Sequence, residues 1–88
     1  MYFRISELGP STDFMDTWQV STNKNFWNCV PDNPNKLTCN LNKGTLTIQG
    51  NQVTFENLIS GQKKVGTYEG NGVIDFKNWK WIKQGEFK

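Results

Sequence analysis

The segment TLTIQGNQVTFE, residues 45–56, constrains the fold of this chain more than any other segment. A two-residue turn at Gly50-Asn51 sets residues of the same chemical kind opposite each other, apolar on one face and polar on the other. The pairs are Gln49 with Gln52, Ile48 with Val53, Thr47 with Thr54, Leu46 with Phe55, and Thr45 with Glu56. Gly in the first turn position suits a type II′ turn, and Gly-Asn also tolerates type I′. The segment therefore predicts a tight antiparallel hairpin.

The same logic extends along the C-terminal half. A turn at Lys77-Asn78 pairs aromatic, ionic and aliphatic residues: Phe76 with Trp79, Asp75 with Lys80, Ile74 with Trp81, and Val73 with Ile82. Before it, a turn at Gly70-Asn71 pairs Tyr68 with Val73, Thr67 with Ile74, and Val65 with Phe76; a turn at Asn71-Gly72 is the alternative. A break in side-chain phase between Phe55 and Leu58 suggests a bulge. Residues 45–84 are therefore predicted to form a five-stranded meander.

The N-terminal half carries weaker signals. Residues 2–8 and 16–21 resemble strands, the latter with Trp18 and Val20 inward. We expect a strand at residues 16–21, alone or after a short helical turn, and the alternative is a helix of two turns or more over residues 10–18. Residues 25–30 and 37–41 are two further predicted strands that flank a Pro-rich loop. Cys29 and Cys39 lie on these flanks and could face each other, either as free thiols or as a disulfide.

Composition supports the same fold class. The chain of 88 residues has no Ala, the best helix former, and 11 Asn, a turn former. We expect one all-β domain spanning residues 1–88, with seven to nine short antiparallel strands in a small up-and-down barrel or a curled sandwich. An exposed edge strand, if only part of the sheet closes, would favour a homo-oligomer. The bias toward Lys, Asn, Ile and Phe suggests an AT-rich genome, as in many phages and marine microbes.

The residue inventory argues against several function classes. The chain has no His and only two Cys, and the spacing of its carboxylates singles out no catalytic pair. We therefore expect that the protein is not an enzyme and has no cofactor and no metal site. A net charge of +2 with dispersed Lys argues against nucleic-acid binding, because dedicated binders carry a clustered basic stripe. No apolar run is long enough for a membrane span, and the N-terminus lacks a signal-peptide pattern, which predicts a cytoplasmic or virion-associated protein.

The aromatic residues remain as candidates for binding. Trp79 and Trp81 share a face with Ile74 and Phe76, which predicts core packing, or alternatively the lining of a ligand pocket inside a small barrel. Trp27 and Tyr68 are expected to be half-exposed, where they could stack on sugars or bases or anchor a partner. The speculative binding residues are therefore Trp27, Tyr68, Trp79 and Trp81.

Two stretches resemble small lipocalin-like, or calycin, barrels. DTWQV at residues 16–20 is placed like the G-x-W segment that opens such barrels, with Asp16 where Gly is expected, and NGVIDFKNWKWIKQ resembles their closing meander. The resemblance implies an up-and-down barrel that binds small apolar ligands or partner proteins. It transfers no binding residue.

These observations favour an interaction or structural module that presents a β surface to a protein partner or a second copy, as in a phage or viral particle. The alternative is a small-molecule or carbohydrate-binding barrel. A third class is a weak binder of single-stranded nucleic acid.

The hairpin at residues 45–56 can be tested directly. Replacing Gly50 with Val should cost on the order of 1 kcal/mol or more of unfolding free energy, because a β-branched residue resists positive φ. Urea unfolding measures the change, and amide contacts in NMR spectra should place Ile48 opposite Val53. A one-residue slip, with Leu46 and Ile48 outward, would contradict the prediction.

Overall fold

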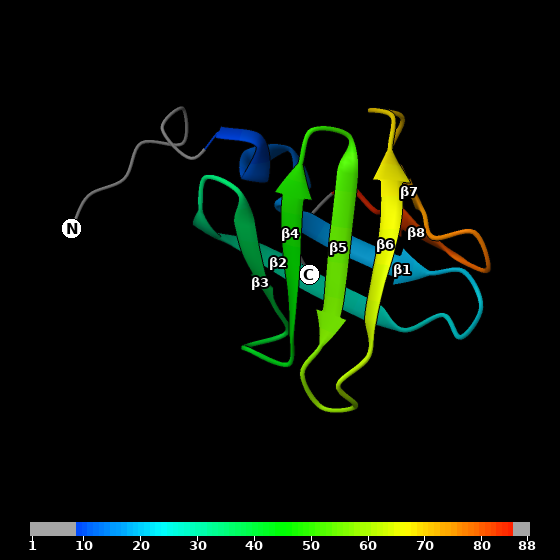
Figure 1. The fold of residues 1–88 in the computed structure, drawn as a ribbon. Helices are drawn as coiled ribbons and strands as arrows, with labels where there is room; N and C mark the ends of the chain where they lie inside the picture. Colours follow the sequence, from blue (N-terminus) through cyan, green and yellow to red (C-terminus); the bar gives the residue numbers. More distant parts are fainter. Residues whose placement is uncertain (1–8, 86–88) are drawn as a thin grey trace.

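Eight antiparallel strands close into a barrel in the computed structural model, which describes residues 9–85 (Figure 1). A short 3-10 helix, η2 (Gly9–Phe14), precedes the first strand. The strands are β1 (Asp16–Val20), β2 (Phe26–Asn33), β3 (Lys36–Cys39), β4 (Gly44–Gln49), β5 (Gln52–Asn57), β6 (Lys63–Tyr68), β7 (Val73–Asp75) and β8 (Lys80–Lys83). The prediction of an all-β up-and-down barrel is confirmed, and the strand predicted at residues 2–8 lies outside the described residues.

Barrel closure depends on the pairing of the first and last strands. Trp18, Gln19 and Val20 of β1 lie opposite Lys83, Ile82 and Trp81 of β8. Because each of the eight strands has a neighbour on both sides, none of them is a free edge. The edge pairing that would have favoured a homo-oligomer therefore has no template among these strands.

The β4–β5 hairpin has the predicted register throughout. All five predicted pairs are present, and Gly50 has a positive φ of 62°. Leu46, Ile48, Val53 and Phe55 are buried on the inner face. The chemical matching of opposite residues was therefore sufficient to predict this register.

The β7–β8 hairpin is also close to its prediction. Val73, Ile74 and Asp75 pair with Ile82, Trp81 and Lys80. Beyond the strand ends, the Phe76 N–H donates to the Trp79 carbonyl at 2.9 Å. Lys77 takes a positive φ of 77° in this turn, and its N–H donates to the Asp75 carboxylate at 2.8 Å.

The register between β6 and β7 differs from both predictions. Tyr68 lies opposite Ile74. The turn at Gly70-Asn71 would have paired Tyr68 with Val73, and the turn at Asn71-Gly72 would have paired it with Asp75. The observed register therefore lies midway between the two predictions. The cause is a close approach at Gly66, where a Cβ atom would lie 2.8 Å from the Asp75 carbonyl oxygen and 2.8 Å from Phe76 Cδ1. With Gly66 on the inner face, Val65 points outward and is 50% exposed.

Two local predictions also fail. The bulge expected after Phe55 is absent, since Phe55 and Glu56 pair regularly with Lys64 and Lys63 and β5 ends at Asn57. The Pro-rich stretch expected to be a loop is largely strand, because β2 continues to residue 33. A register shift between Pro31 and Asn33 allows this, as bulges are among the few places where a strand tolerates Pro.

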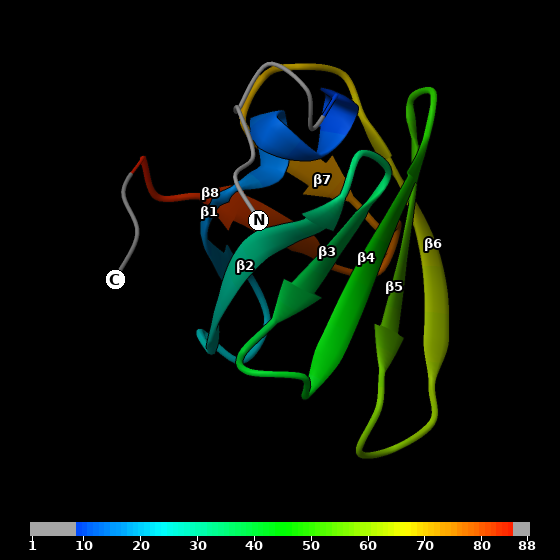
Figure 2. The same ribbon diagram turned by 90° about the vertical axis from the view of Figure 1, so that its left-hand side faces the viewer.

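The N-terminal segment closes one end of the barrel. The prediction of a short helical turn followed by a strand with Trp18 and Val20 buried is confirmed. η2 lies across the upper end in Figures 1 and 2, where the Phe14 ring packs on Trp18 and Tyr68 with centroid distances of 6.0 and 4.6 Å. The Trp18 indole N–H donates to the Phe14 carbonyl at 3.0 Å. In residues 9–85 no helix has the length and apolar character needed to span a membrane.

The Gly66 contact leads to a stability prediction. Gly66→Ala should lower the unfolding free energy by about 1–3 kcal/mol, because the added methyl group overlaps the Asp75 carbonyl and the Phe76 ring. Thr67→Val, on the exposed outer face of the same strand, should change it by no more than about 0.5 kcal/mol. Chemical denaturation of both variants measures the difference, and equal stabilities would contradict the close approach.

Candidate functional site

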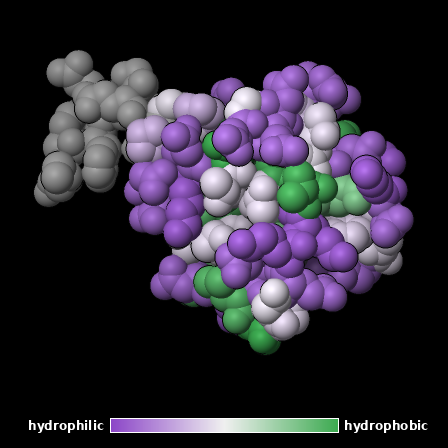
Figure 3. Space-filling view, viewed as in Figure 1, coloured by the Kyte–Doolittle hydropathy of each residue, from purple (hydrophilic) through white to green (hydrophobic). Residues whose placement is uncertain are grey.

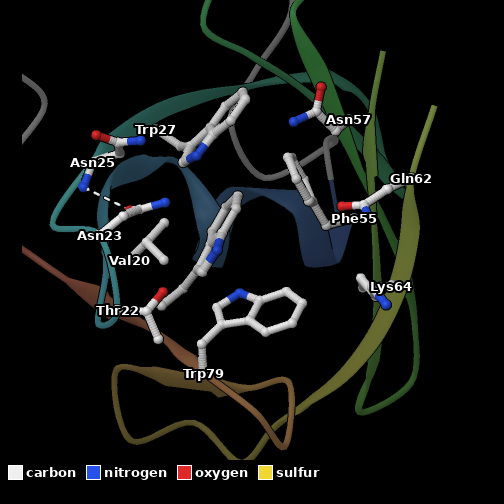
Figure 4. A pocket seen from close by; sticks show the side chains of 11 residues that line it. Val20, Thr22, Asn23, Asn25, Trp27, Phe55, Asn57, Gln62, Lys64 and Trp79 are labelled. Carbon is white, nitrogen blue, oxygen red and sulfur yellow. Dashed lines mark hydrogen bonds between the residues drawn. The ribbon is translucent and has the colours of Figure 1, made fainter. Parts of the chain in front are cut away.

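A pocket of about 290 Å³ lies at the barrel end opposite η2. Its volume is at the lower end of the range for small-molecule sites. Figure 4 shows the pocket with the blue N-terminal segment behind it, and side chains from β1, β2, β5, β6 and β8 and their loops around it. The lining residues are Val20, Thr22, Asn23, Asn25, Trp27, Phe55, Asn57, Gln62, Lys64, Trp79 and Trp81.

Aromatic rings form the inner part of the pocket. The rings of Trp27 and Trp81 are nearly parallel, with their centroids 6.0 Å apart. The centroid of the Phe55 ring lies 4.9 Å from that of Trp27 and 4.7 Å from that of Trp81. Gly44 makes this arrangement possible, because a Cβ atom there would lie 2.7 Å from Phe55 Cε1. The rings constrain one another, so this wall is organised before any ligand binds.

Trp79 forms a separate side wall. One face of its indole stacks on the buried Phe76 ring, with centroids 5.4 Å apart and planes 16° from parallel. The side chain is half-buried and lines the pocket. In Figure 4 its indole is seen nearly face-on, across the pocket from Asn57. An aromatic ring supported on one face offers its other face as a flat platform.

The three Trp indoles of the pocket keep their N–H donors available. Trp18 at the closed end donates to a carbonyl, whereas Trp27, Trp79 and Trp81 donate to no other residue that the structure describes. Trp81 is only 1% exposed, yet no fully buried polar side-chain atom in residues 9–85 lacks a partner. The indole N–H of Trp81 is therefore accessible, and among the described residues the space that it reaches is the pocket.

Amide side chains surround the opening. Two of them organise their own loops: Asn23 Oδ1 accepts from the Asn25 N–H at 2.9 Å, and Asn57 Oδ1 accepts from the N–H groups of Ile59 and Ser60. The side-chain amides of Asn25 and Gln62, in contrast, form no hydrogen bond within the described part of the chain. Each carries donors and an acceptor that a ligand could use.

One lysine also lines the pocket. Lys64 lies opposite Phe55 in the β5–β6 ladder and therefore at an inward-facing position, near the start of β6, where its side chain is exposed at the mouth of the barrel. Figure 4 shows it on the same side as Gln62, with Asn23 and Asn25 on the other side. No carboxylate is among the lining residues, and Lys64 Nζ forms no ion pair with residues 9–85.

The structure brings together three of the four aromatic residues singled out from the sequence. Trp27, Trp79 and Trp81 line the pocket, whereas Tyr68 packs on Phe14 and Trp18 at the closed end. Trp27 and Tyr68 are half-buried, as predicted, and Trp81 belongs both to the core and to the pocket. Sequence reasoning missed Asn25, Gln62 and Lys64, which no local pattern distinguishes from other polar residues of the chain.

The two cysteines lie opposite each other in the β2–β3 ladder, inside the barrel wall. Both are free thiols and fully buried, with their Sγ atoms 2.6 Å apart. Burial, and then the neighbouring Cys39 and Asp16, raise the pKa of the Cys29 thiol. A thiol held in the protonated form is a poor nucleophile and a poor metal ligand. Within residues 9–85, no three Cys, Asp or Glu side chains cluster closely enough to hold a metal ion.

The fold and the pocket together define a class of protein: a small up-and-down β-barrel, plugged at one end and open at the other. No protein-family model matches the chain, and neither a curated protein nor a solved structure shows significant similarity to it. The function must therefore be argued from the pocket itself.

Two tryptophan variants test the roles assigned to the pocket walls. Trp81→Ala should cost about 3–5 kcal/mol of unfolding free energy, because the fully buried ring leaves a cavity between Trp27, Phe55 and Phe76. Trp79→Ala should cost clearly less, since its ring is half-buried and stacks on Phe76 at the side of the pocket. Thermal unfolding compares the two, and an unchanged melting temperature for Trp81→Ala would contradict its place in the core.

Proposed function

We propose that this protein binds a small carbohydrate in the open end of its barrel. The observation that carries the proposal is the combination of the supported Trp79 platform with unpaired indole and amide donors around one pocket. A pyranose ring has an apolar C–H face, which packs on an aromatic ring, and equatorial hydroxyl groups, which need hydrogen-bond partners. The indole N–H of Trp81 and the amides of Asn25 and Gln62 supply such partners.

The polarity of the pocket favours a sugar over an apolar ligand. Lipocalin-like barrels, which two stretches of the sequence resemble, take small apolar ligands, and such a ligand would leave the amide and indole groups unpaired. Burying an unpaired polar group costs about 1–3 kcal/mol. The pocket also ends on Trp81 and Phe55 within the barrel, so it has room for about one or two sugar rings rather than for a long acyl chain.

A second candidate function is the docking of a protein partner on the same end of the barrel. Leu41 in the β3–β4 loop is 94% exposed and Ile59 in the β5–β6 loop is 74% exposed. Figure 3 shows a largely hydrophilic face with hydrophobic surface at its lower end. The interaction module expected from the sequence would use such side chains. The mass of the protein in solution, measured by light scattering, tests whether the partner is a second copy of the same chain.

Sugar binding can be measured through the intrinsic tryptophan fluorescence. Titration with mono- and disaccharides should give a saturable change for at least one sugar, because three Trp line the pocket. Trp79→Ala should abolish binding while the protein remains folded, since it removes the platform.

Tyr68→Phe serves as the control, since it changes an aromatic residue at the closed end and should leave sugar binding intact. Laurate serves as the apolar ligand for comparison. Saturable binding of laurate with no response to any sugar would reject the carbohydrate proposal in favour of an apolar ligand.

A further inference from the structure

We propose that the sugar is acidic, a pyranose carrying a carboxylate that pairs with Lys64 at the mouth of the barrel; this inference rests on the proposed sugar-binding function. The juxtaposition that carries it is that of Lys64, which has no ion-pair partner in residues 9–85, with the aromatic platform and the amides of Asn25 and Gln62. The ring would lie on Trp79, and its carboxylate would lie toward β6.

The polarity of β6 is inverted at this point. Along the strand, inner positions alternate with outer ones, so Lys64, Gly66 and Tyr68 face inward while Lys63, Val65 and Thr67 face outward. Apolar side chains occupy inner positions on the neighbouring strands, as with Leu46, Phe55 and Ile74. At residues 64 and 65 the cation holds the inward-facing position, exposed at the mouth of the barrel, and the apolar Val65 faces outward. A local violation of the hydrophobic pattern is typical of functional sites.

The inversion is enforced by the barrel rather than by the strand itself. Only a glycine fits at position 66 beside the Phe76 ring, because any Cβ atom there would clash with the Asp75 carbonyl. Since side chains alternate along a strand, placing Gly66 inward also places Lys64 inward, two residues nearer the mouth. The contact between Gly66 and Phe76, the ring on which Trp79 stacks, therefore also directs the Lys64 side chain toward the same pocket.

No acidic group in residues 9–85 forms an ion pair with this cation. The nearest carboxylate along the ladder, Glu56, faces outward opposite Lys63. Asp75 accepts a hydrogen bond from the Lys77 N–H in the β7–β8 turn. With no acidic side chain lining the pocket, a bound anion would be the first negative charge that Lys64 meets there.

A carboxylate fits this arrangement better than a phosphate. Lys64 supplies one positive charge as a compact ammonium group, which one carboxylate balances. A sugar phosphate carries nearly two negative charges and three acceptor oxygens, and the pocket offers it neither a second cation nor a helix N-terminus. A uronic acid is the simplest chemical class that combines one carboxylate with a pyranose face.

The test uses sugars that differ only at this group. Glucuronate, its neutral amide glucuronamide, glucose and glucose 6-phosphate, together with the galacto counterparts, are titrated by calorimetry into the wild type, Lys64→Gln and Lys63→Gln. Lys63→Gln is the matched control, because it removes the same charge from the outer face of the same strand. Thermal unfolding confirms that both variants remain folded.

The wild type should bind the uronate roughly fivefold to tenfold more tightly than the uronamide. Lys64→Gln should remove this preference without weakening binding of the uronamide, and Lys63→Gln should retain it. Equal affinities for uronate and uronamide would overturn the inference and leave the proposed function standing. A similar loss of preference in both variants would also overturn it, since that loss would reflect the general field of the strand rather than contact with Lys64.

Two further outcomes would overturn the inference. Tighter binding of the sugar phosphate than of the uronate, with the same dependence on Lys64, would assign the anionic group to phosphate. If no sugar of either series binds, the proposed function fails and the inference fails with it.

Discussion

The packing of the Phe76 ring on the backbone at Gly66 determines how β6 and β7 pair in the second half of the barrel. A Cβ atom at residue 66 would overlap the Asp75 carbonyl, so only glycine allows β6 and β7 to approach this closely. The contact sets the side-chain phase of β6, directing Val65 outward and Lys64 inward. It also supports Trp79, whose indole stacks on the Phe76 ring. One steric constraint thus governs a strand register, an aromatic platform and the position of a charge.

The aromatic residues divide between the two ends of the barrel and serve different purposes there. At the closed end, Phe14, Trp18 and Tyr68 pack on one another, and the Trp18 N–H is satisfied by a backbone carbonyl. At the open end, the tryptophans stack as closely but retain their N–H donors. A group that is satisfied within the protein stabilises the fold, whereas an accessible donor beside a cavity is available to a ligand.

Much of the fold could be predicted from local chemistry, and much of the site could not. The β4–β5 and β7–β8 registers followed from the matching of residues across two-residue turns, because each pair lies within a few residues of its turn. The β6–β7 register failed because its determinant, the approach of Phe76 to Gly66, spans ten residues and involves no pairing of like side chains. Tyr68 was grouped with the binding residues only because exposure alone does not reveal which end of a barrel a residue occupies.

The sequence by itself determined the fold class and the aromatic character of the interior, because alternation of apolar residues and Gly-Asn turns act over short distances along the chain. It also singled out Trp27, Tyr68, Trp79 and Trp81 as candidate binding residues. Only the tertiary structure decided that Trp27, Trp79 and Trp81 meet at one end, that Gly44 and Gly66 make room for the rings, and that Lys64 faces the same space. Those decisions depend on closure of β1 against β8, which joins residues more than sixty positions apart and leaves no trace in local periodicity.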